Sequence, residues 1–177
     1  YAGATVGPWY PITPSTSLMD AFKGFCQKLR IDPETGKNNF AVIQAEDELS
    51  AIGMVLGANW NGARAFTATS GPGISLMSEF IGLAYYAEIP AVIFDVQRVG
   101  PSTGIPTKSE QGDLNIALHG LHGDAPHLVL APNSVADCLR TTQWAVQLAE
   151  SLQVPAIVLS DQFFGQTRAV IDEPVDL

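Results

Sequence analysis

The sequence predicts an α/β fold, a doubly wound and mostly parallel sheet with helices on both faces. Short apolar runs, such as residues 40–45 and 91–96, alternate with longer segments whose apolar residues recur at helical spacing. The runs show no alternation of polar and apolar residues, which indicates strands covered on both faces. Strand and helix alternate five or six times in this way, as is typical of a parallel sheet between helix layers.

Length and composition favour one domain. The chain has 177 residues, of which 46% are hydrophobic, and no segment resembles a linker. Its 18 acidic and 9 basic residues give a net charge of −9, which argues against nucleic acid because binding phosphates requires clustered Lys and Arg. No apolar run approaches the length of a membrane span and no signal-peptide pattern opens the chain, so we expect a cytoplasmic protein with no membrane partner.

The first predicted strand covers residues 3–10 and runs into a loop in which Pro11 and Pro14 stop the pairing. Ser15 and Thr16 can cap the following helix, which extends to about residue 30. The apolar residues expected on its buried face are Leu18, Phe22, Phe25 and Leu29.

The apolar run 40–45 is the second predicted strand, and it delivers Glu46, Asp47 and Glu48 to the start of a helix. One interpretation is that all three are first-turn acids that complement the helix macrodipole. The other is that one of them lies against apolar cover, where desolvation raises its pKa and lets it share a proton with a ligand nitrogen. The pattern leaves both open.

Glycines mark the rest of this helix. Gly53 and Gly57 lie four residues apart on one helical face, which predicts close packing against another backbone. Gly62 is expected to end the helix as a C′ glycine.

A third strand over residues 64–68 leads into the turn Thr-Ser-Gly-Pro-Gly at 69–73 and then a helix over about residues 74–86. The turn has neither the spacing and lysine of a phosphate-binding loop nor a GxGxxG fingerprint. It is therefore either a plain connection between strand and helix or a backbone platform for a flat heterocycle.

A buried strand over residues 91–96 precedes a polar loop, residues 97–112, that is too long to be a simple connection. Arg98 stands just after the strand, where it could form a fork onto a carboxylate or merely a surface ion pair. A short helix is expected over about residues 113–118, and a strand over 128–131.

The last predicted helix starts at Pro132 with Asn133 as its cap, and the last strand covers residues 155–160. The residues of the helix that form its apolar stripe are Val135, Leu139, Thr142, Val146 and Ala149. The carboxyl ends of parallel strands meet at one edge, which is where open α/β sheets bind ligands. The residues expected at that edge are Thr13, Glu48, 69–73, Arg98 and Asp161.

Thiol and imidazole side chains form no metal-binding pattern. Cys26 and Cys138 each lie inside a helical pattern, so we expect free thiols and neither a metal clip nor an iron–sulfur ligand set. His119, His122 and His127 have no acid nearby at ligand spacing, and we expect surface or structural histidines.

Four stretches together resemble a known family: YPITPS (10–15), AEDELSAIG (45–53), FTATSGPG (66–73) and QRVGPSTG (97–104) with its continuation to Asp113. They are similar to the pyrimidine-binding domain of thiamine diphosphate enzymes, specifically to the alpha subunit of 2-oxoacid:ferredoxin oxidoreductases. The resemblance covers essentially the whole chain. Because the chain begins at Tyr1 and ends just after a strand-like run, we expect residues 1–177 to be one such domain, part of a longer subunit.

The resemblance implies roles for individual residues. Glu48 would hydrogen-bond N1′ of the cofactor's aminopyrimidine ring, as a buried general acid–base. Thr13 and Arg98 would contact the carboxylate and oxo group of the substrate. The aminopyrimidine pocket would be lined by Thr69, Ser70 and Gly71. Lys108 could meet a second substrate carboxylate.

The resemblance also implies partners. A beta subunit would carry the diphosphate-binding domain with its Mg²⁺, and the iron–sulfur cluster would also lie in the partner. Ferredoxin, coenzyme A and a 2-oxoacid would complete the reaction, with 2-oxoglutarate or a broad range of 2-oxoacids favoured over pyruvate. The low charged fraction, 15%, fits a domain that is partly covered in an oligomer. Two alternatives remain: a non-catalytic α/β assembly domain, and a thiamine diphosphate decarboxylase or synthase of the acetolactate type.

Overall fold

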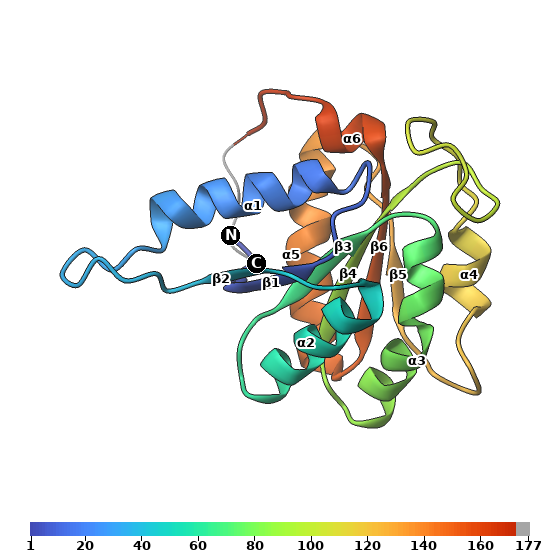
Figure 1. The fold of residues 1–177 in the computed structure, drawn as a ribbon, viewed down its shortest axis with the longest axis horizontal. Helices are drawn as coiled ribbons and strands as arrows, with labels where there is room; N and C mark the ends of the chain where they lie inside the picture. Colours follow the sequence, from blue (N-terminus) through green and yellow to red (C-terminus); the bar gives the residue numbers. More distant parts are fainter. Residues whose placement is uncertain (173–177) are drawn as a thin grey trace.

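The computed structural model describes residues 1–172, which form a parallel sheet with helices on both faces (Figure 1). The strands are β1 (Val6–Trp9), β2 (Ala41–Gln44), β3 (Phe66–Thr69), β4 (Ala91–Gln97), β5 (Leu128–Leu130) and β6 (Pro155–Asp161). The helices are α1 (Thr16–Leu29), α2 (Glu48–Trp60), α3 (Pro72–Tyr86), α4 (Leu114–His119), α5 (Val135–Leu152) and α6 (Gln162–Gln166). The predicted order of strands and helices is confirmed up to β6, and α6 was not predicted.

All strand pairs are parallel. Four strands pair in the order β3-β4-β6-β5, and β1 pairs with β2 as a separate two-stranded unit. A single parallel bridge between Val6 and Ala65 places β1 beside β3. The resulting spatial order is β2-β1-β3-β4-β6-β5, a doubly wound arrangement that confirms the predicted fold class.

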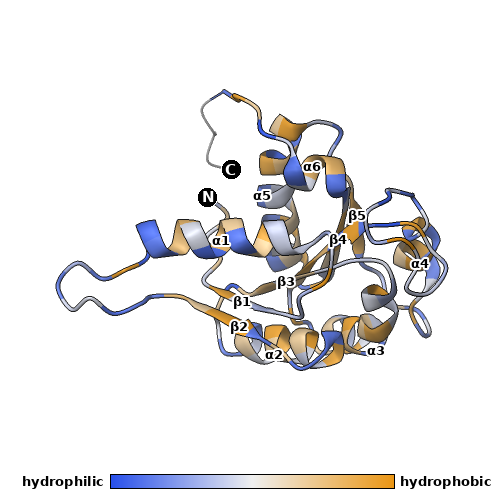
Figure 2. Ribbon diagram, turned by 45° about the horizontal axis from the view of Figure 1, so that its top comes forward, coloured by the Kyte–Doolittle hydropathy of each residue, from blue (hydrophilic) through white to orange (hydrophobic). Residues whose placement is uncertain are grey.

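The sheet separates two apolar cores (Figure 2). Helices α2, α3 and α4 cover one face, where Ile93 of β4 is fully buried. Helices α1 and α5 cover the other face, on which Phe66 and Phe94 make an edge-to-face contact at 5.5 Å between ring centroids. Because the odd-numbered residues of β4 face the first core, Asp95 points to the side covered by α2, α3 and α4.

Two predictions about burial are wrong at the edge of the sheet. Strand β2 is an edge strand rather than one covered on both faces, and Ile43 and Gln44 are exposed. Helix α1 buries Met19 and Cys26, whereas Phe25 is 64% exposed; Leu29 is exposed as well. Figure 1 shows the reason, because the end of α1 continues past β2 and has no strand beneath it.

Helix α2 ends as predicted. Gly62 has φ +85°, its N–H donates to Asn59 O at 2.9 Å, and Ala63 N–H donates to Ala58 O at 3.1 Å, which is the Schellman motif. Gly53, however, packs against the Phe80 ring of α3 rather than a backbone.

Gly57, the second glycine of the predicted packing face, has open space beside it, which corrects the expectation of a close backbone approach there. At α5, Ser134 is the N-cap instead of Asn133, because the Ser134 hydroxyl accepts from Asp137 N–H at 3.1 Å. Both cysteines are free, Cys26 buried and Cys138 half-buried. None of the helices within residues 1–172 combines the length and apolar character of a bilayer-spanning segment.

Candidate functional site

The candidate site lies at the carboxyl ends of the strands, and α2 and α3 both begin there. Glu48 is the first residue of α2, and the 69–73 turn joins β3 to α3. Thr13 lies in the connection between β1 and α1, and Arg98 directly follows β4. The structure thus brings the sequence-predicted residues to one edge.

The three acids before and in α2 occupy different environments. Glu46 is exposed. Asp47 is the N-cap, and its Oδ1 accepts from Ser50 N–H at 2.6 Å. Hydrogen bonding by the Ser50 hydroxyl, and then by its N–H, lowers the pKa of Asp47. Glu48 is only 6% exposed, and no hydrogen bond or ion pair to its carboxyl is found within residues 1–172. Only Glu48 has the burial that a proton-sharing carboxyl requires.

The glycine turn forms a cradle beside Glu48. Gly71 has φ +52°, a conformation that residues with a side chain rarely adopt. A Cβ placed on Gly73 would overlap with Thr69 Oγ1 and would lie 3.0 Å from Cγ of Glu48. The turn therefore holds Glu48, Thr69 and the start of α3 in close contact, and only glycine fits at position 73.

Buried polar atoms without a hydrogen-bond partner gather at this edge. Within residues 1–172 they belong to Thr67, Thr69, Ser70, Asp95, Gln97, Arg98 and Asp113. These residues come from the ends of β3 and β4, the turn between β3 and α3, and the start of α4. An unsatisfied buried polar group costs about 1–3 kcal/mol, so a cluster of them is typical of a site prepared for a ligand.

Arg98 connects three segments of the site. Its side chain is only 5% exposed, and Nη1 donates to the carbonyl oxygen of Thr13 at 2.8 Å. Its Cγ and Nε lie across the turn, 3.2 Å and 3.3 Å from the place a Cβ on Gly71 would take. The Arg98 Nε is buried without a partner, while Thr13 is exposed. A surface ion pair, one of the two sequence interpretations, does not describe this arginine.

A pair of acids that sequence reasoning missed lies next to Arg98. Asp95 is fully buried at the end of β4, and burial together with the nearby Asp113 carboxyl raises its pKa well above the usual range. Burial also raises the pKa of Asp113. A signal was present, because Asp95 is the one charged residue in the apolar run 91–96.

Among the remaining residues singled out from the sequence, Asp161 and His127 stabilise local structure. The Asp161 carboxylate caps α6 by accepting from Phe164 N–H at 3.0 Å. Both ring nitrogens of His127 contact backbone carbonyl oxygens, those of Ala125 and Ala117, as expected for a structural histidine. Lys108 is exposed, and its backbone pairs with Val99 beside Arg98. Residues 1–172 contain no group of three or more His, Cys, Asp or Glu arranged to hold a metal ion.

A sequence model of the family described as "Pyruvate flavodoxin/ferredoxin oxidoreductase, thiamine diP-bdg" matches residues 1–176. Over 173 residues the chain is 44% identical to the 2-oxoglutarate synthase subunit KorA of Methanothermobacter marburgensis, covering 98% of this chain and 44% of that subunit. It is 41% identical over 174 residues to the 2-oxoacid:ferredoxin oxidoreductase subunit alpha of Saccharolobus solfataricus, covering 97% and 28%. The chain spans less than half the length of these relatives.

Two solved structures superpose on the chain. The 2-oxoglutarate:ferredoxin oxidoreductase from Magnetococcus marinus, solved with 2-oxoglutarate, coenzyme A and succinyl-CoA bound, superposes with a TM-score of 0.85 at 44% identity, covering 93% of this chain and 27% of that one. A thiamine diphosphate-dependent 4-hydroxybenzoylformate decarboxylase from Rhodococcus jostii superposes with a TM-score of 0.66 at 15% identity, covering 92% and 28%, which shows a shared fold alone.

Proposed function

Because the chain belongs to the thiamine diphosphate-binding family of pyruvate flavodoxin/ferredoxin oxidoreductases, we propose that it provides the pyrimidine-binding half of a catalytic site for the oxidative decarboxylation of a 2-oxoacid. The observation that carries this proposal is the buried Glu48 carboxyl beside the glycine cradle. The remaining half of the site, in this proposal, belongs to the partner subunit.

The residues of the cradle fit the aminopyrimidine end of the cofactor. An aminopyrimidine ring has two acceptor nitrogens and an amino group, so a carboxyl that shares a proton suits the nitrogen N1′ and hydroxyl oxygens suit the amino group. Glu48 offers the carboxyl, and the buried hydroxyls of Thr69 and Ser70 have no partner among residues 1–172. Because Gly71 and Gly73 lack side chains, Arg98 packs against the turn at Gly71, and Thr69 and Glu48 pack against it at Gly73, which gathers their polar groups at one place.

Glu48 would hold or release a proton at the ring nitrogen N1′. Burial keeps this carboxyl from competing water, which strengthens its hydrogen bond to a ligand nitrogen. When bound, thiamine diphosphate supplies the electron sink for loss of carbon dioxide from a 2-oxoacid. The contribution of this chain is to place the carboxyl, exclude water and fix the ring orientation.

Arg98 and Thr13 are proposed to bind the substrate. Arg98 is held in place through Thr13 O and has a buried Nε without a partner, so it can present donors to a carboxylate. The exposed Thr13 side chain stands at the same place for the oxo group. Relatives named for 2-oxoglutarate and for 2-oxoacids in general favour those substrates over pyruvate alone. Lys108, exposed and next to Val99, is available for a second carboxylate.

Partners complete the proposed enzyme. A beta subunit would bind the diphosphate and Mg²⁺, and iron–sulfur clusters there would pass electrons to ferredoxin while coenzyme A accepts the acyl group. The relatives are named as subunits, which supports an assembly of several chains. A non-catalytic assembly domain and an acetolactate-type enzyme are the alternatives, and the resemblance to 2-oxoacid oxidoreductases over nearly the whole chain disfavours both.

The test is Glu48→Gln in the complete enzyme, with Glu46→Gln as the matched control. We expect Glu48→Gln to lower 2-oxoacid-dependent reduction of ferredoxin or a viologen dye at least about 100-fold, because the amide cannot share the proton. Assembly, measured by size-exclusion chromatography, should be unchanged. Glu46→Gln should be fully active because Glu46 is exposed. Full activity of Glu48→Gln would exclude this role and favour the assembly-domain alternative.

A further inference from the structure

Asp95 interrupts an otherwise apolar strand face. It follows Ala91 and Ile93 on the side of β4 that α2, α3 and α4 cover, and its neighbours in register are Thr69 and Leu159. Its side chain is fully buried, and within residues 1–172 neither carboxyl oxygen accepts a hydrogen bond of good geometry, although the Gly71 N–H lies close by. A buried carboxylate in this position would be strongly unfavourable, so its persistence calls for a specific partner.

Asp113 is that partner. It occupies the N-cap position of α4, where an aspartate normally accepts from a backbone N–H of its own helix, yet its side chain makes no cap hydrogen bond. The Asp113 carboxyl instead lies beside Asp95, and its Oδ2 is buried without a donor. Two ionised carboxyls would both be acceptors and could only repel, whereas one proton between them supplies the missing donor.

The surrounding charges determine which acid holds the proton. The groups that act on the pair are Arg98 after β4, Glu110 of the 97–112 loop and the N–H of Gly71 in the turn. Neighbouring β6 presents only Leu159 there. Burial raises the pKa of both acids, and Asp95 is fully buried whereas Asp113 is only half-buried. Asp95 is therefore the proton donor and Asp113 the anionic acceptor next to Arg98.

We propose that Asp95 and Asp113 act as one proton-sharing unit that positions Arg98 across the Gly71 turn, a role that rests on the function proposed above for Arg98. The neutral Asp95 anchors the unit to β4, and the Asp113 carboxylate fixes the guanidinium by charge. Neither acid touches the substrate. Both are positioning residues that set the direction of the Arg98 donors.

The unit also joins segments that must be aligned for the site to form. Asp95 belongs to β4 and Asp113 to the start of α4, at the two ends of the long loop. Arg98 extends this link to Thr13 through its hydrogen bond of 2.8 Å. Loss of the shared proton would therefore disturb the substrate contacts while leaving Glu48, which lies on α2, in place.

A double-mutant cycle in the complete enzyme tests positioning through Arg98. We expect Asp113→Asn and Arg98→Ala each to raise KM for the 2-oxoacid about tenfold or more, and the combined variant to raise it no further. Asp124→Asn, which removes an exposed carboxylate after α4, is the control and should leave KM unchanged. Additive effects in the combined variant would overturn the proposal.

Comparing an asparagine with an alanine at position 95 distinguishes a shared proton from a role of Asp95 in packing alone. Asp95→Asn keeps a neutral donor of the same shape, so its KM should stay within about twofold of the wild type, whereas Asp95→Ala should raise KM as Asp113→Asn does. An asparagine variant as impaired as the alanine variant would refute proton sharing.

Thermal unfolding provides a readout independent of activity. For an acid whose pKa is raised by folding, stability is present while the group is protonated and is lost as pH rises through the folded-state pKa. Between the pKa of Asp95 in the unfolded chain and its raised pKa in the folded chain, the unfolding temperature of the wild type should therefore fall with rising pH, and that of Asp95→Asn should fall less. Equal pH dependence would overturn the shared proton. If Arg98→Ala leaves KM unchanged while this difference persists, the proposed function of Arg98 fails and the acid unit stands.

Discussion

At the scale of single residues, the site depends on environment more than on residue type. Glu46, Asp47 and Glu48 are adjacent acids, yet one is exposed, one caps a helix and one is buried beside the glycine cradle. The sequence could predict that acids would stand at this helix start. It could not choose among them by spacing, because burial depends on how α3 and the turn pack against α2, and only the family resemblance pointed to Glu48.

Gly73 provides a test at this scale. Gly73→Ala should lower activity of the complete enzyme by at least about tenfold, because its Cβ would overlap with Thr69 Oγ1 and displace Glu48, 3.0 Å away at Cγ. The matched control is Gly82→Ala in the same helix, where a Cβ meets no atom. That variant should be stabilised by about 0.5–1 kcal/mol because alanine favours helix, with activity retained. Steady-state kinetics and thermal unfolding measure both, and equal activity of the two variants would contradict the cradle.

Residue patterns also explain what was missed. Asp95 is visible as the one charged residue of an apolar run, but its partner Asp113 lies 18 residues further along the chain, at the far end of an irregular loop. Helical or strand periodicity cannot pair such residues. Their proximity follows from the position of α4 over the sheet, which is a tertiary property.

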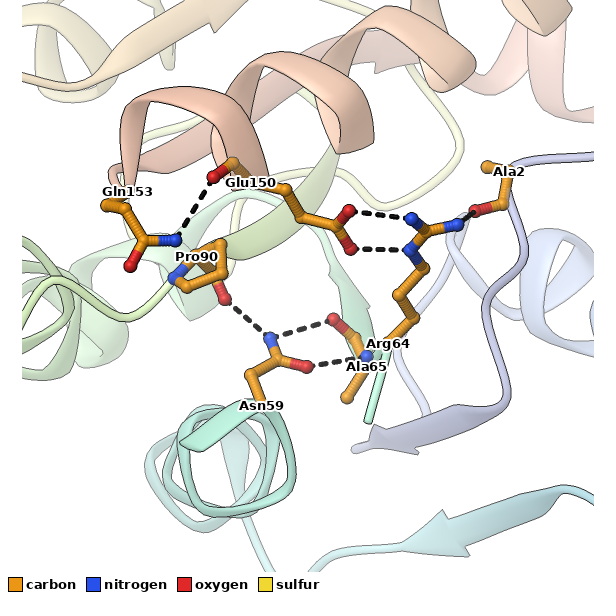
Figure 3. A network of polar contacts seen from close by, with 7 residues as sticks. All are labelled: Ala2, Asn59, Arg64, Ala65, Pro90, Glu150 and Gln153. Atoms are coloured by element: carbon orange, nitrogen blue, oxygen red, sulfur yellow. Dashed lines mark hydrogen bonds and ion pairs between the residues drawn. The ribbon is translucent and has the colours of Figure 1, made fainter. Parts of the chain in front are cut away.

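At the scale of elements, polar contacts define both ends of α2, and those of Asn59 join it to the sheet. Asp47 caps its start near the site, and Asn59 near its end bonds to two other segments (Figure 3). The Asn59 side chain donates to Pro90 O at 2.6 Å and accepts from Ala65 N–H at 2.6 Å. It thereby joins α2 to the residues that directly precede β3 and β4.

Removing this link should destabilise the fold without touching the site. Asn59→Ala leaves the Ala65 N–H and the Pro90 carbonyl without their partner, so we expect a loss of about 1–3 kcal/mol in the free energy of unfolding. Asn59→Asp keeps the acceptor for the Ala65 N–H, so its loss in the free energy of unfolding should lie between those of the wild type and Asn59→Ala. Asn61→Ala, which removes an exposed hydrogen bond to Gly57 O, should cost less than about 0.5 kcal/mol. Denaturant unfolding compares the three, and equal losses at positions 59 and 61 would contradict the link.

The order and the ends of the elements could be predicted because they depend on local sequence. The burial of an element was harder to predict because it depends on the strands and helices packed around it. The order of strands and helices, the glycine turn and the end of α2 at Gly62 follow from short-range chemistry. The exposed end of α1 and the edge position of β2 do not, because an apolar run looks the same at the centre and at the margin of a sheet.

At the scale of the whole molecule, the proposed function gives this chain one end of a cofactor site. The cradle at the edge of β3 and β4 offers a carboxyl and hydroxyls, which suit a pyrimidine ring. In this proposal the diphosphate and its Mg²⁺ are bound by the partner subunit. A net charge of −9 also disfavours the approach of a polyanion.

This arrangement predicts how the isolated chain discriminates between ligands. Thiamine and thiamine diphosphate should bind the chain alone with affinities within about threefold of each other, since in this proposal both present the same ring to Glu48 and the partner subunit binds the diphosphate. Both should raise the unfolding temperature alike, and Glu48→Gln should weaken both equally. Calorimetric titration measures the affinities. A strong preference for the diphosphate form would show that the chain holds the phosphates itself, and the proposed division of the site between subunits would then be wrong.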